Sequence, residues 1–425
     1  MRLTAFRLAA LGLLFGSAAY AQDLEGDWQG TLQAGNQPLR LIVTFTPADG
    51  GRWTGTMRSI DQGNDWGAGA AITAITREGA QVRFVVDATR GTYEGTLTSD
   101  RSSIEGTWTQ RQPLRLAFRR ATPDTAWKDP AVHTVQFVTV DRNVKLEVLD
   151  FGGSGRPLVF LAGLGNTAHV FDRFAPKFTA THHAYAVTRR GFGDSSAPPD
   201  GYAADRLGDD VLAVLDALKL ARPALAGHSI AGEELSSIAS RHPDRVSGLV
   251  YLDAGYPYAF YNADRGDVVL DSIDLRRKLD LLVNGPADSR PTIKELMADL
   301  PRFERNLEAR QKELDGMPPA LLAQQGSQPT APRAIMAGAQ KYTNLGPVPI
   351  LAIYALPHDL GPIAGDDRAA FEVQDLERTG AQAAAFEKGV PSARVVRLPH
   401  AHHYVFRSNE ADVLREMNAF LSVLQ

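Results

Sequence analysis

The chain has 425 residues, which is enough for two or three domains. Hydrophobic residues make up 44% and charged residues 22% of it, as in ordinary globular proteins. The net charge of −4 gives no reason to expect a nucleic acid or an anionic membrane as a partner. The sequence contains no cysteine, which excludes thiol catalysis, disulfides and cysteine-ligated metal sites.

Residues 1–21 have the composition of a signal peptide. Two arginines come before an apolar run at 8–16, and this run is too short to cross a bilayer. Ala19 and Ala21 are small residues at the two positions that a signal peptidase recognises. We therefore expect an exported protein, periplasmic or secreted, whose mature chain begins at Gln22 and has no transmembrane segment.

Residues 22–122 are predicted to form an all-β accessory domain. Apolar and polar residues alternate in stretches such as 39–45, which is typical of half-buried strands. A motif of glycine, aromatic residue and glycine occurs at 26–30, 51–55 and 91–95. It suggests bent strands whose aromatic side chains pack over the glycines. We expect about eight antiparallel strands in a small barrel or sandwich.

Residues 123–133 are polar, contain two prolines and are predicted to be a linker. From 134 to 425, short apolar strands alternate with amphipathic helices, as in a mostly parallel α/β sheet covered on both faces. A stretch of helical pattern broken by prolines, at about 255–347, interrupts this alternation. The predicted fold class is therefore α/β, with a small β domain in front of it.

Ser229 lies between a short apolar run that ends at Gly227 and a helical pattern that begins at Gly232. A serine on so sharp a strand-to-helix turn has an exposed hydroxyl, and the helix N-terminus stabilises negative charge formed beside it. The stretch resembles the nucleophile elbow of the α/β-hydrolase family. The second glycine of that pattern is expected at Ala231, and here it comes one position later.

A serine nucleophile needs a base, and the base needs an acid that orients it. The resemblance covers about 134–425 and implies the chain order serine, acid, histidine. His403, after the last predicted strand, matches the family's base, with His402 as the runner-up. Asp359, in the short loop after the strand that follows the helical stretch, matches the acid. Asp253 follows an earlier strand and competes with Asp359; we expect it instead at the entry turn of the helical stretch.

The resemblance also implies an oxyanion hole made of two backbone N–H groups. Leu164 stands just after a predicted strand in the sequence Ala-Gly-Leu-Gly, where the family usually has His-Gly. Ile230 directly follows the nucleophile. Such donors are typically worth about 3 kcal/mol each in the transition state. The helical stretch at about 255–347 stands where the family has a cap, which supplies the substrate pocket and excludes water.

Four histidines near the C-terminal part of the chain raise the question of a metal site: His358, His400, His402 and His403. Zinc sites do use clustered histidines. However, His402 and His403 are adjacent and would point apart on an extended chain. No nearby acidic residue completes a hydrolytic metal motif. We therefore expect neither a metal nor an organic cofactor.

Glu233 and Glu234 stand in the first turn of the helix behind Ser229. Acidic side chains there complement the helix dipole. Because this turn is close to the nucleophile, both are also candidate binding residues for an amine on the substrate.

The sequence predicts an enzyme, a serine hydrolase that cleaves carboxylic esters of small molecules through an acyl-serine intermediate. One alternative is an aminopeptidase-like amidase that acts on short peptides or amino-acid amides. A second alternative is a non-catalytic binding protein on a hydrolase scaffold. Reaction of Ser229 with a fluorophosphonate would separate an enzyme from a binding protein.

Overall fold

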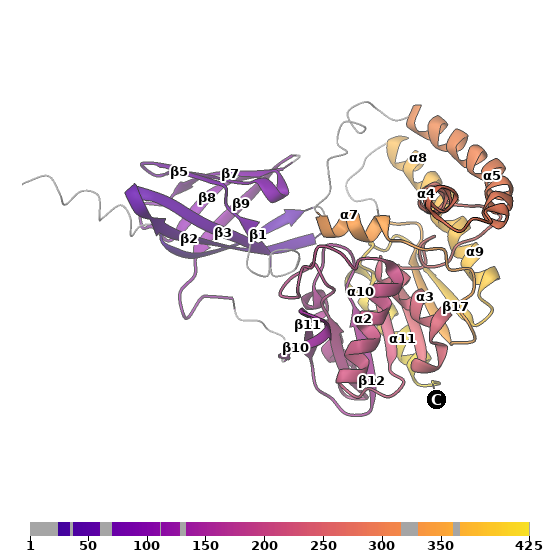
Figure 1. Cartoon of the computed structure of the whole chain (residues 1–425). Helices are drawn as coiled ribbons and strands as arrows, with labels where there is room; N and C mark the ends of the chain where they lie inside the picture. The colour runs from indigo at the N-terminus through magenta and orange to yellow at the C-terminus, as the bar shows by residue number, and fades with distance from the viewer. Residues whose placement is uncertain are drawn as a thin grey trace, which may run out of the picture. The chain divides into compact units, whose positions relative to one another are not determined.

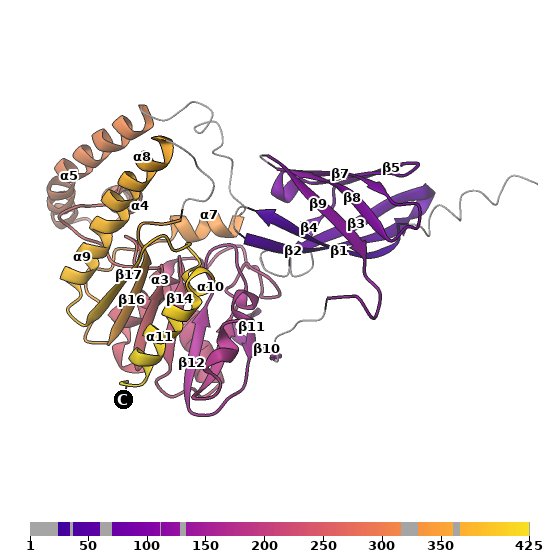
Figure 2. The same ribbon diagram turned by 180° about the vertical axis from the view of Figure 1, so that it is seen from behind.

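The computed structural model describes residues 24–34, 37–59, 70–110, 112–127, 133–315, 330–359 and 366–424 (Figures 1 and 2). They divide into two compact units, one up to residue 127 and one from residue 133 onward. The predicted signal peptide and part of the predicted linker lie outside the described residues. Within the described ranges, no helix has the length and apolar character needed to span a bilayer.

The first unit is an antiparallel sheet with nine strands among the described residues. The strands are β1 (Gly26–Ala34), β2 (Gln37–Ala48), β3 (Arg52–Ser59), β4 (Ala70–Ala71), β5 (Ala74–Glu78), β6 (Gln81–Val86), β7 (Gly91–Leu97), β8 (Ser103–Thr109) and β9 (Pro113–Arg120). Their order in the sheet is β4-β3-β2-β1-β9-β8-β7-β6-β5.

The sheet curls until its two edges are joined. Its edge strands β4 and β5 are consecutive in the chain, and the residues between them bond to both sides of the sheet. The N–H of Ile72 donates to the carbonyl of Gly55 in β3, and the N–H of Thr73 donates to the carbonyl of Val85 in β6. Of the two predicted forms, the structure is therefore closer to a barrel than to a sandwich.

Aromatic side chains fill the inside of this sheet, as the glycine motif predicts. A Cβ placed on Gly91 would lie 1.8 Å from the ring of Trp108. The Phe84 and Tyr93 rings stack with centroids 4.9 Å apart, and the Tyr93 hydroxyl donates to the carbonyls of Ile104 and Leu116. The glycines thus make room for large rings that a Cβ would displace.

The second unit is built on a mixed sheet. Its strands are β10 (Thr134–Asp141), β11 (Val144–Asp150), β12 (Arg156–Leu161), β13 (His182–Val187), β14 (Ala224–His228), β15 (Gly248–Leu252), β16 (Ile350–Ala355) and β17 (Ala393–Leu398). Their order is β10-β11-β13-β12-β14-β15-β16-β17. The first two strands form an antiparallel hairpin, and the strands from β13 to β17 are parallel.

Helices cover both faces of this sheet, as the alternating pattern predicts. One face packs against α2 (Ala204–Ala217), α3 (Ala231–Arg241) and α9 (Ala381–Gly389). The other packs against the short 3-10 helices η3 (Ala168–Phe171) and η4 (Ala175–Phe178), and against α10 (Val405–Ser408) and α11 (Glu410–Leu421). Figure 2 shows α11 lying along this second face. Fully buried parallel strands of this kind explain the continuous apolar runs in the sequence.

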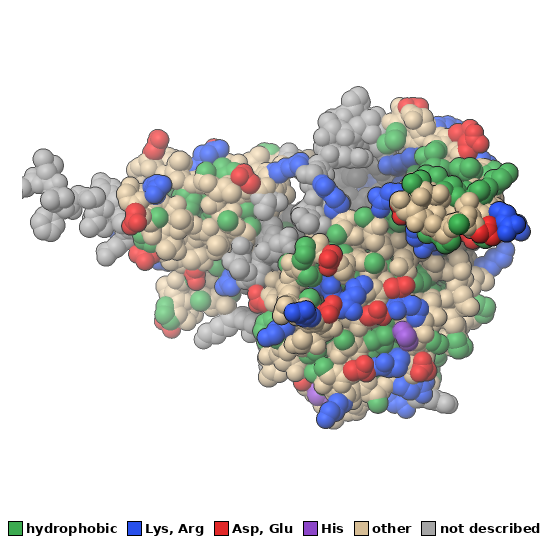
Figure 3. Space-filling model, in the orientation of Figure 1, with side chains coloured by type: hydrophobic (Ala, Val, Ile, Leu, Met, Phe, Trp, Pro, Cys, Tyr) green, Lys and Arg blue, Asp and Glu red, His purple; other side chains and the backbone are tan. Residues whose placement is uncertain are grey.

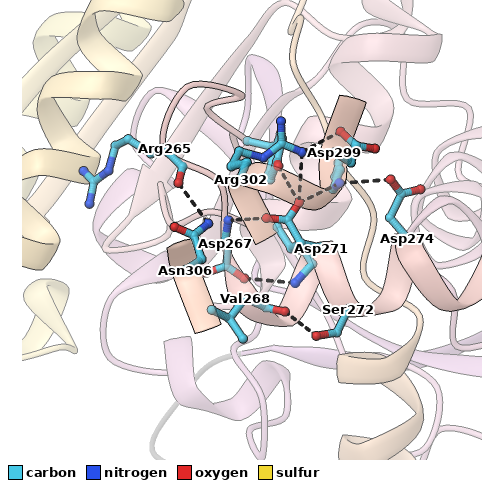
Figure 4. A network of polar contacts seen from close by, with 12 residues as sticks. Arg265, Asp267, Val268, Asp271, Ser272, Asp274, Asp299, Arg302 and Asn306 are labelled. Atoms are coloured by element: carbon cyan, nitrogen blue, oxygen red, sulfur yellow. Dashed lines mark hydrogen bonds and ion pairs between the residues drawn. The ribbon is translucent and has the colours of Figure 1, made fainter. Parts of the chain in front are cut away.

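The expected cap contains α4 (Val268–Asn284), α5 (Arg290–Asp315) and α7 (Thr330–Ala337); residues 316–329 lie outside the described part. Inside it, Lys341 bonds to Asp271 at 2.7 Å, and Lys278 on α4 bonds to Asp299 on α5 at 2.6 Å. Arg302 on α5 bonds to Asp299 at 2.7 Å, in the polar network shown in Figure 4. Pro301 lies inside α5 and does not end it, contrary to the expected break. Contacts with α4 on both sides of this proline hold the helix together.

The outer surface of the cap is partly apolar. The exposed large apolar side chains on its two long helices are Val269, Leu279, Leu281, Val283, Ile293, Met297, Leu300 and Leu307. Figure 3 shows apolar side chains gathered over these helices. Ion pairs link α4 to α5, and a small apolar cluster that includes Leu270 lies at the start of α4.

A further helical segment that the sequence analysis did not anticipate stands between β16 and β17. It consists of α8 (Asp366–Asp375), the π-helical turn η6 (Leu376–Gly380) and then α9. The end of α8 carries Asp375, whose carboxylate contacts the loop that follows β16. This segment therefore contributes to the candidate active site.

Candidate active site

Ser229 stands on a strained turn between β14 and α3. Its φ is +54°, which is uncommon for a residue with a side chain. A Cβ on Gly227 would lie 3.1 Å from the Cβ of Ala231, so small residues are needed on both sides of the turn. A Cβ on Gly232 would lie 2.1 Å from the carbonyl oxygen of Ala254. Position 232 therefore requires glycine, because the chain just after β15 passes close to it. Position 231 tolerates alanine.

His403 reaches Ser229 from the loop between β17 and α10. Its Nε2 is 2.9 Å from the Ser229 hydroxyl oxygen. Burial and the neighbouring His403 lower the pKa of His228 to about 3, so the His228 ring is neutral. Its Nε2 lies 3.0 Å from the backbone carbonyl of His403 and donates to it. The structure thus brings the predicted nucleophile and the predicted base together, and His228 supports the loop of the base.

The carboxylate beside His403 belongs to Asp253 and not to Asp359. Its Oδ2 is 2.6 Å from Nδ1 of His403, and the side chain is fully buried at the end of β15. Burial alone would raise the pKa of Asp253, but hydrogen bonds from His358 and His403 lower it to about 2. Asp253 is therefore ionised and holds the ring of His403 with Nε2 toward the serine.

The sequence-based choice of Asp359 is corrected for a reason of local geometry. His358 forms an isolated parallel bridge with Ala401, so the chain is extended there. Adjacent side chains on an extended chain point to opposite sides. Nε2 of His358 lies 2.9 Å from Oδ2 of Asp253, so the His358 side chain points toward Asp253. The backbone N–H of Asp359 donates to the carbonyl of Ala401, which fixes this register.

The two proposed oxyanion donors flank the nucleophile. A Cβ on Gly163 would lie 3.2 Å from the Cβ of Ser229, so the loop after β12 passes directly against the elbow. In the described parts of the chain, the N–H groups of Leu164 and Ile230 donate to no protein acceptor. Tyr404 anchors the same loop by donating to Asn166 at 3.1 Å. Both N–H groups are thus available for a developing oxyanion.

Glu233 and Glu234 differ in their surroundings. Arg189 donates to both carboxylate oxygens of Glu234, at 2.6 and 2.7 Å, so the charge of Glu234 is already paired inside the protein. Glu233 is fully buried, and neither of its oxygens has a partner among the described residues. Burial and the neighbouring Glu234 raise the pKa of Glu233 well above its usual value. Of the two, Glu233 alone remains a candidate for substrate binding.

Tyr258 packs against the apolar cluster that contains Ile230, the residue that follows Ser229. Burial raises the pKa of Tyr258 well above its usual value, and the charges of Asp253 and Glu233 raise it further. The contact of Tyr258 with this cluster was not anticipated from the sequence, where the tyrosine stands in the entry to the cap.

Among the residues that the structure describes, two groups of side chains have possible metal-ligand atoms within 4.8 Å of one another. One is Asp253, His358 and His403; the other is His133, His169 and Asp172. In the first group, the two imidazole nitrogens are 2.6 and 2.9 Å from the same oxygen of Asp253. These are hydrogen-bond distances, so we describe the first group as a network of proton donors around one carboxylate.

The chain matches the Alpha/beta hydrolase family over residues 158–416. It therefore belongs to this family, and the sheet order and the elbow agree with that assignment.

Individual relatives are similar over shorter stretches. The chain is 31% identical over 144 residues to the AB hydrolase superfamily protein YisY of Bacillus subtilis, covering 31% of this chain and 53% of YisY. It is 36% identical over 104 residues to a putative non-heme haloperoxidase of Mycobacterium phage D29, covering 24% of this chain and 37% of that protein. The match thus spans about a third to a half of the length of these relatives.

Among solved structures, a thermophilic esterase from Thermogutta terrifontis has 18% sequence identity and a TM-score of 0.44. The alignment covers 68% of this chain and 98% of the esterase.

Proposed function

We propose that this protein is a serine hydrolase that cleaves carboxylic esters through an acyl-serine intermediate. The observation that carries the proposal is the unbroken hydrogen-bonded chain of Ser229, His403 and Asp253. The two heavy-atom distances along it are 2.9 and 2.6 Å. This is the arrangement in which a neutral imidazole removes the serine proton while a carboxylate orients the ring.

In the proposed reaction, the Ser229 hydroxyl oxygen attacks the ester carbonyl carbon and its proton passes to Nε2 of His403. The carbonyl oxygen becomes an oxyanion, which the N–H groups of Leu164 and Ile230 stabilise. When the tetrahedral intermediate collapses, the C–O bond to the alcohol breaks and His403 returns the proton to that alcohol. Water then attacks the acyl-serine in the same way and releases the acid.

Ester hydrolysis is the form of this chemistry that the site supports best. Serine at the elbow favours acyl transfer, whereas a carboxylate nucleophile there would favour attack on an epoxide or a haloalkane. Alcohols are better leaving groups than amines, so esters require the least assistance from residues outside the triad.

The test is covalent labelling combined with a substrate panel. A fluorophosphonate should modify Ser229, as located by peptide mass spectrometry, and Ser229→Ala should abolish the labelling. Turnover of p-nitrophenyl esters that Ser229→Ala removes would support the esterase. A folded protein that neither labels nor hydrolyses any ester or amide would instead support a non-catalytic binding protein.

A second candidate function is hydrolysis of amides or esters of amino acids, and Glu233 is the observation that favours it. A buried carboxyl group without a partner is costly, and a substrate ammonium would ionise it and pair with it. Glu233 also stands in the first turn of α3, directly behind the elbow that carries Ser229.

Glu233→Gln distinguishes the two functions. If Glu233 binds a substrate amine, the substitution should raise KM for aminoacyl p-nitroanilides at least tenfold more than for p-nitrophenyl acetate, which has no amine. Equal effects on both substrates would exclude the amine-binding role.

We also propose that the protein is exported, with cleavage after Ala21. The support is the charged start, the short apolar run at 8–16 and the small residues Ala19 and Ala21. N-terminal sequencing of the protein from periplasm or medium should begin at Gln22. An intact Met1 on cell-retained protein would contradict export.

A further inference from the structure

His358 lies between two carboxylates, and each of its ring nitrogens faces one of them. Nε2 is 2.9 Å from Oδ2 of Asp253. Nδ1 is 3.0 Å from both carboxylate oxygens of Asp375, at the end of α8. The backbone N–H of His358 also donates to Asp375, at 2.7 Å. Asp375 therefore fixes both the backbone and the ring of His358.

Among the described residues, the other groups that contact the two carboxylates are hydrogen-bond donors. Asp253 accepts from the backbone N–H of Ala355 and from the hydroxyl of Tyr256, both at 3.0 Å. Asp375 also accepts from the hydroxyl of Thr379, at 2.8 Å. An ionised carboxylate has no proton to give, so a histidine placed between two of them must carry a proton on each nitrogen.

The electrostatics agree with that geometry. Burial alone would lower the pKa of His358, but hydrogen bonds and charges from Asp253 and Asp375 raise it to about 9. Its side chain is 16% exposed, and the two carboxylates are 0% and 15% exposed. At neutral pH the ring is therefore a cation in a mostly dry site.

We propose that the His358 imidazolium, held by Asp253 and Asp375, shares the Asp253 carboxylate with His403 and so extends catalysis toward acidic pH. A general base can accept the Ser229 proton only while it is itself neutral. The cation at His358 competes for the same carboxylate oxygen, and its ring centre lies 6.4 Å from that of His403. Two imidazolium rings at that distance repel, so the His358 cation opposes a second positive charge on His403.

His358 is thus a positioning residue, since it acts on the substrate only through Asp253 and His403. The other polar groups around it fit this role. Tyr256 has its hydroxyl 3.2 Å from Nε2 of His358 and donates to Asp253. Asp359, its neighbour in the chain, belongs to an extended segment and is expected to point to the other side.

The first test is the pH dependence of kcat/KM for p-nitrophenyl acetate in the full-length protein. In His358→Gln the acidic limb should move up by about one pH unit, because the competing cation is gone. Asp375→Asn should move it in the same direction by less. His242→Gln, at the end of α3 and outside the network, is the matched control and should leave the profile unchanged. An acidic limb that stays in place while kcat falls at every pH would mean that His358 only supports the fold.

The second test needs no variant of the network. In wild-type protein labelled with ¹⁵N-histidine, the His358 ring should show two protonated nitrogens at pH 7 and titrate near pH 9. A His358 ring that is neutral at pH 7 would overturn the inference. The inference rests on the proposed function, but their failures differ. Loss of fluorophosphonate labelling at Ser229 would refute the function, whereas an unshifted acidic limb with labelling intact would refute the role of His358.

Discussion

Asp253 and Asp359 both follow strands at the same end of the parallel sheet, yet their positions differ. Asp253 comes directly after β15 with a φ of +47°, and its N–H donates to the carbonyl of Ile353 in the neighbouring strand. Asp359 comes four residues after Ala355, the end of β16, in a segment bridged to the loop of His403. The first turn directs its carboxylate into the site, whereas the register of the second segment directs His358 there. Closeness to a strand end therefore does not by itself identify a catalytic acid.

The largest loss of activity is expected from changes to Ser229 and His403, the two residues that the catalytic aspartate would support. Ser229→Ala and His403→Ala should each lower kcat by about a millionfold, and the double variant should be little worse because the two residues act as one unit. These values set the baseline against which the aspartates are compared. Ester hydrolysis rates and circular dichroism measure activity and folding. Multiplying losses in the double variant would contradict a shared mechanism.

A smaller effect is expected on stability, at the loop that carries Asp359. The pKa of His358 is about 9 in the folded protein and about 6.5 in an unfolded chain. Because the pKa is higher in the folded protein, the contribution of His358 to the free energy of unfolding is complete below pH 6.5. It is lost as the pH rises to 9. The loss should be up to about 3 kcal/mol.

Urea denaturation of wild type and His358→Gln at pH 6 and pH 9.5 measures this contribution. The advantage of wild type should be large at pH 6 and small at pH 9.5. A difference between the two proteins that is the same at both pH values would contradict a protonated His358.

The smallest effect on activity is expected at Tyr256, whose hydroxyl donates to Asp253. Tyr256→Phe removes one donor at 3.0 Å from Asp253, while both imidazoles and the Ala355 N–H remain. The loss should be about 1 kcal/mol, or about fivefold in kcat. Tyr261→Phe, which removes a hydroxyl bond to Asp271 inside the cap, is the control. A loss above a hundredfold for Tyr256→Phe would point to direct contact with substrate.

Much of the fold follows from the sequence because its signals are local. Period-two alternation predicts the first sheet, and short apolar runs between helices predict the second. The elbow at Ser229 and the histidine after the last strand are also visible, because each depends on a turn next to an apolar run. The helices between β16 and β17 were not anticipated, and Pro301 was expected to break a helix that in fact continues through it.

The acid and its partners could not be predicted in the same way. Asp253, His358 and Asp375 meet only in the folded chain, and no spacing connects them. The choice between His358 and Asp359 depends on the register of a single bridge, which the sequence does not specify. The different environments of Glu233 and Glu234 depend on Arg189, which approaches from the end of β13. Long-range contacts of this kind decide the roles of neighbouring residues.

The central claim is that Asp253 orients His403 for acyl transfer by Ser229. The most direct measurement compares kcat of Asp253→Asn and Asp359→Asn on the same ester, with both proteins shown to be folded. The claim predicts a loss of about ten-thousandfold for Asp253→Asn, because the amide would hold the imidazole in the wrong tautomer. It predicts a change within about threefold for Asp359→Asn. Near-native activity of Asp253→Asn beside an inactive Asp359→Asn would contradict it.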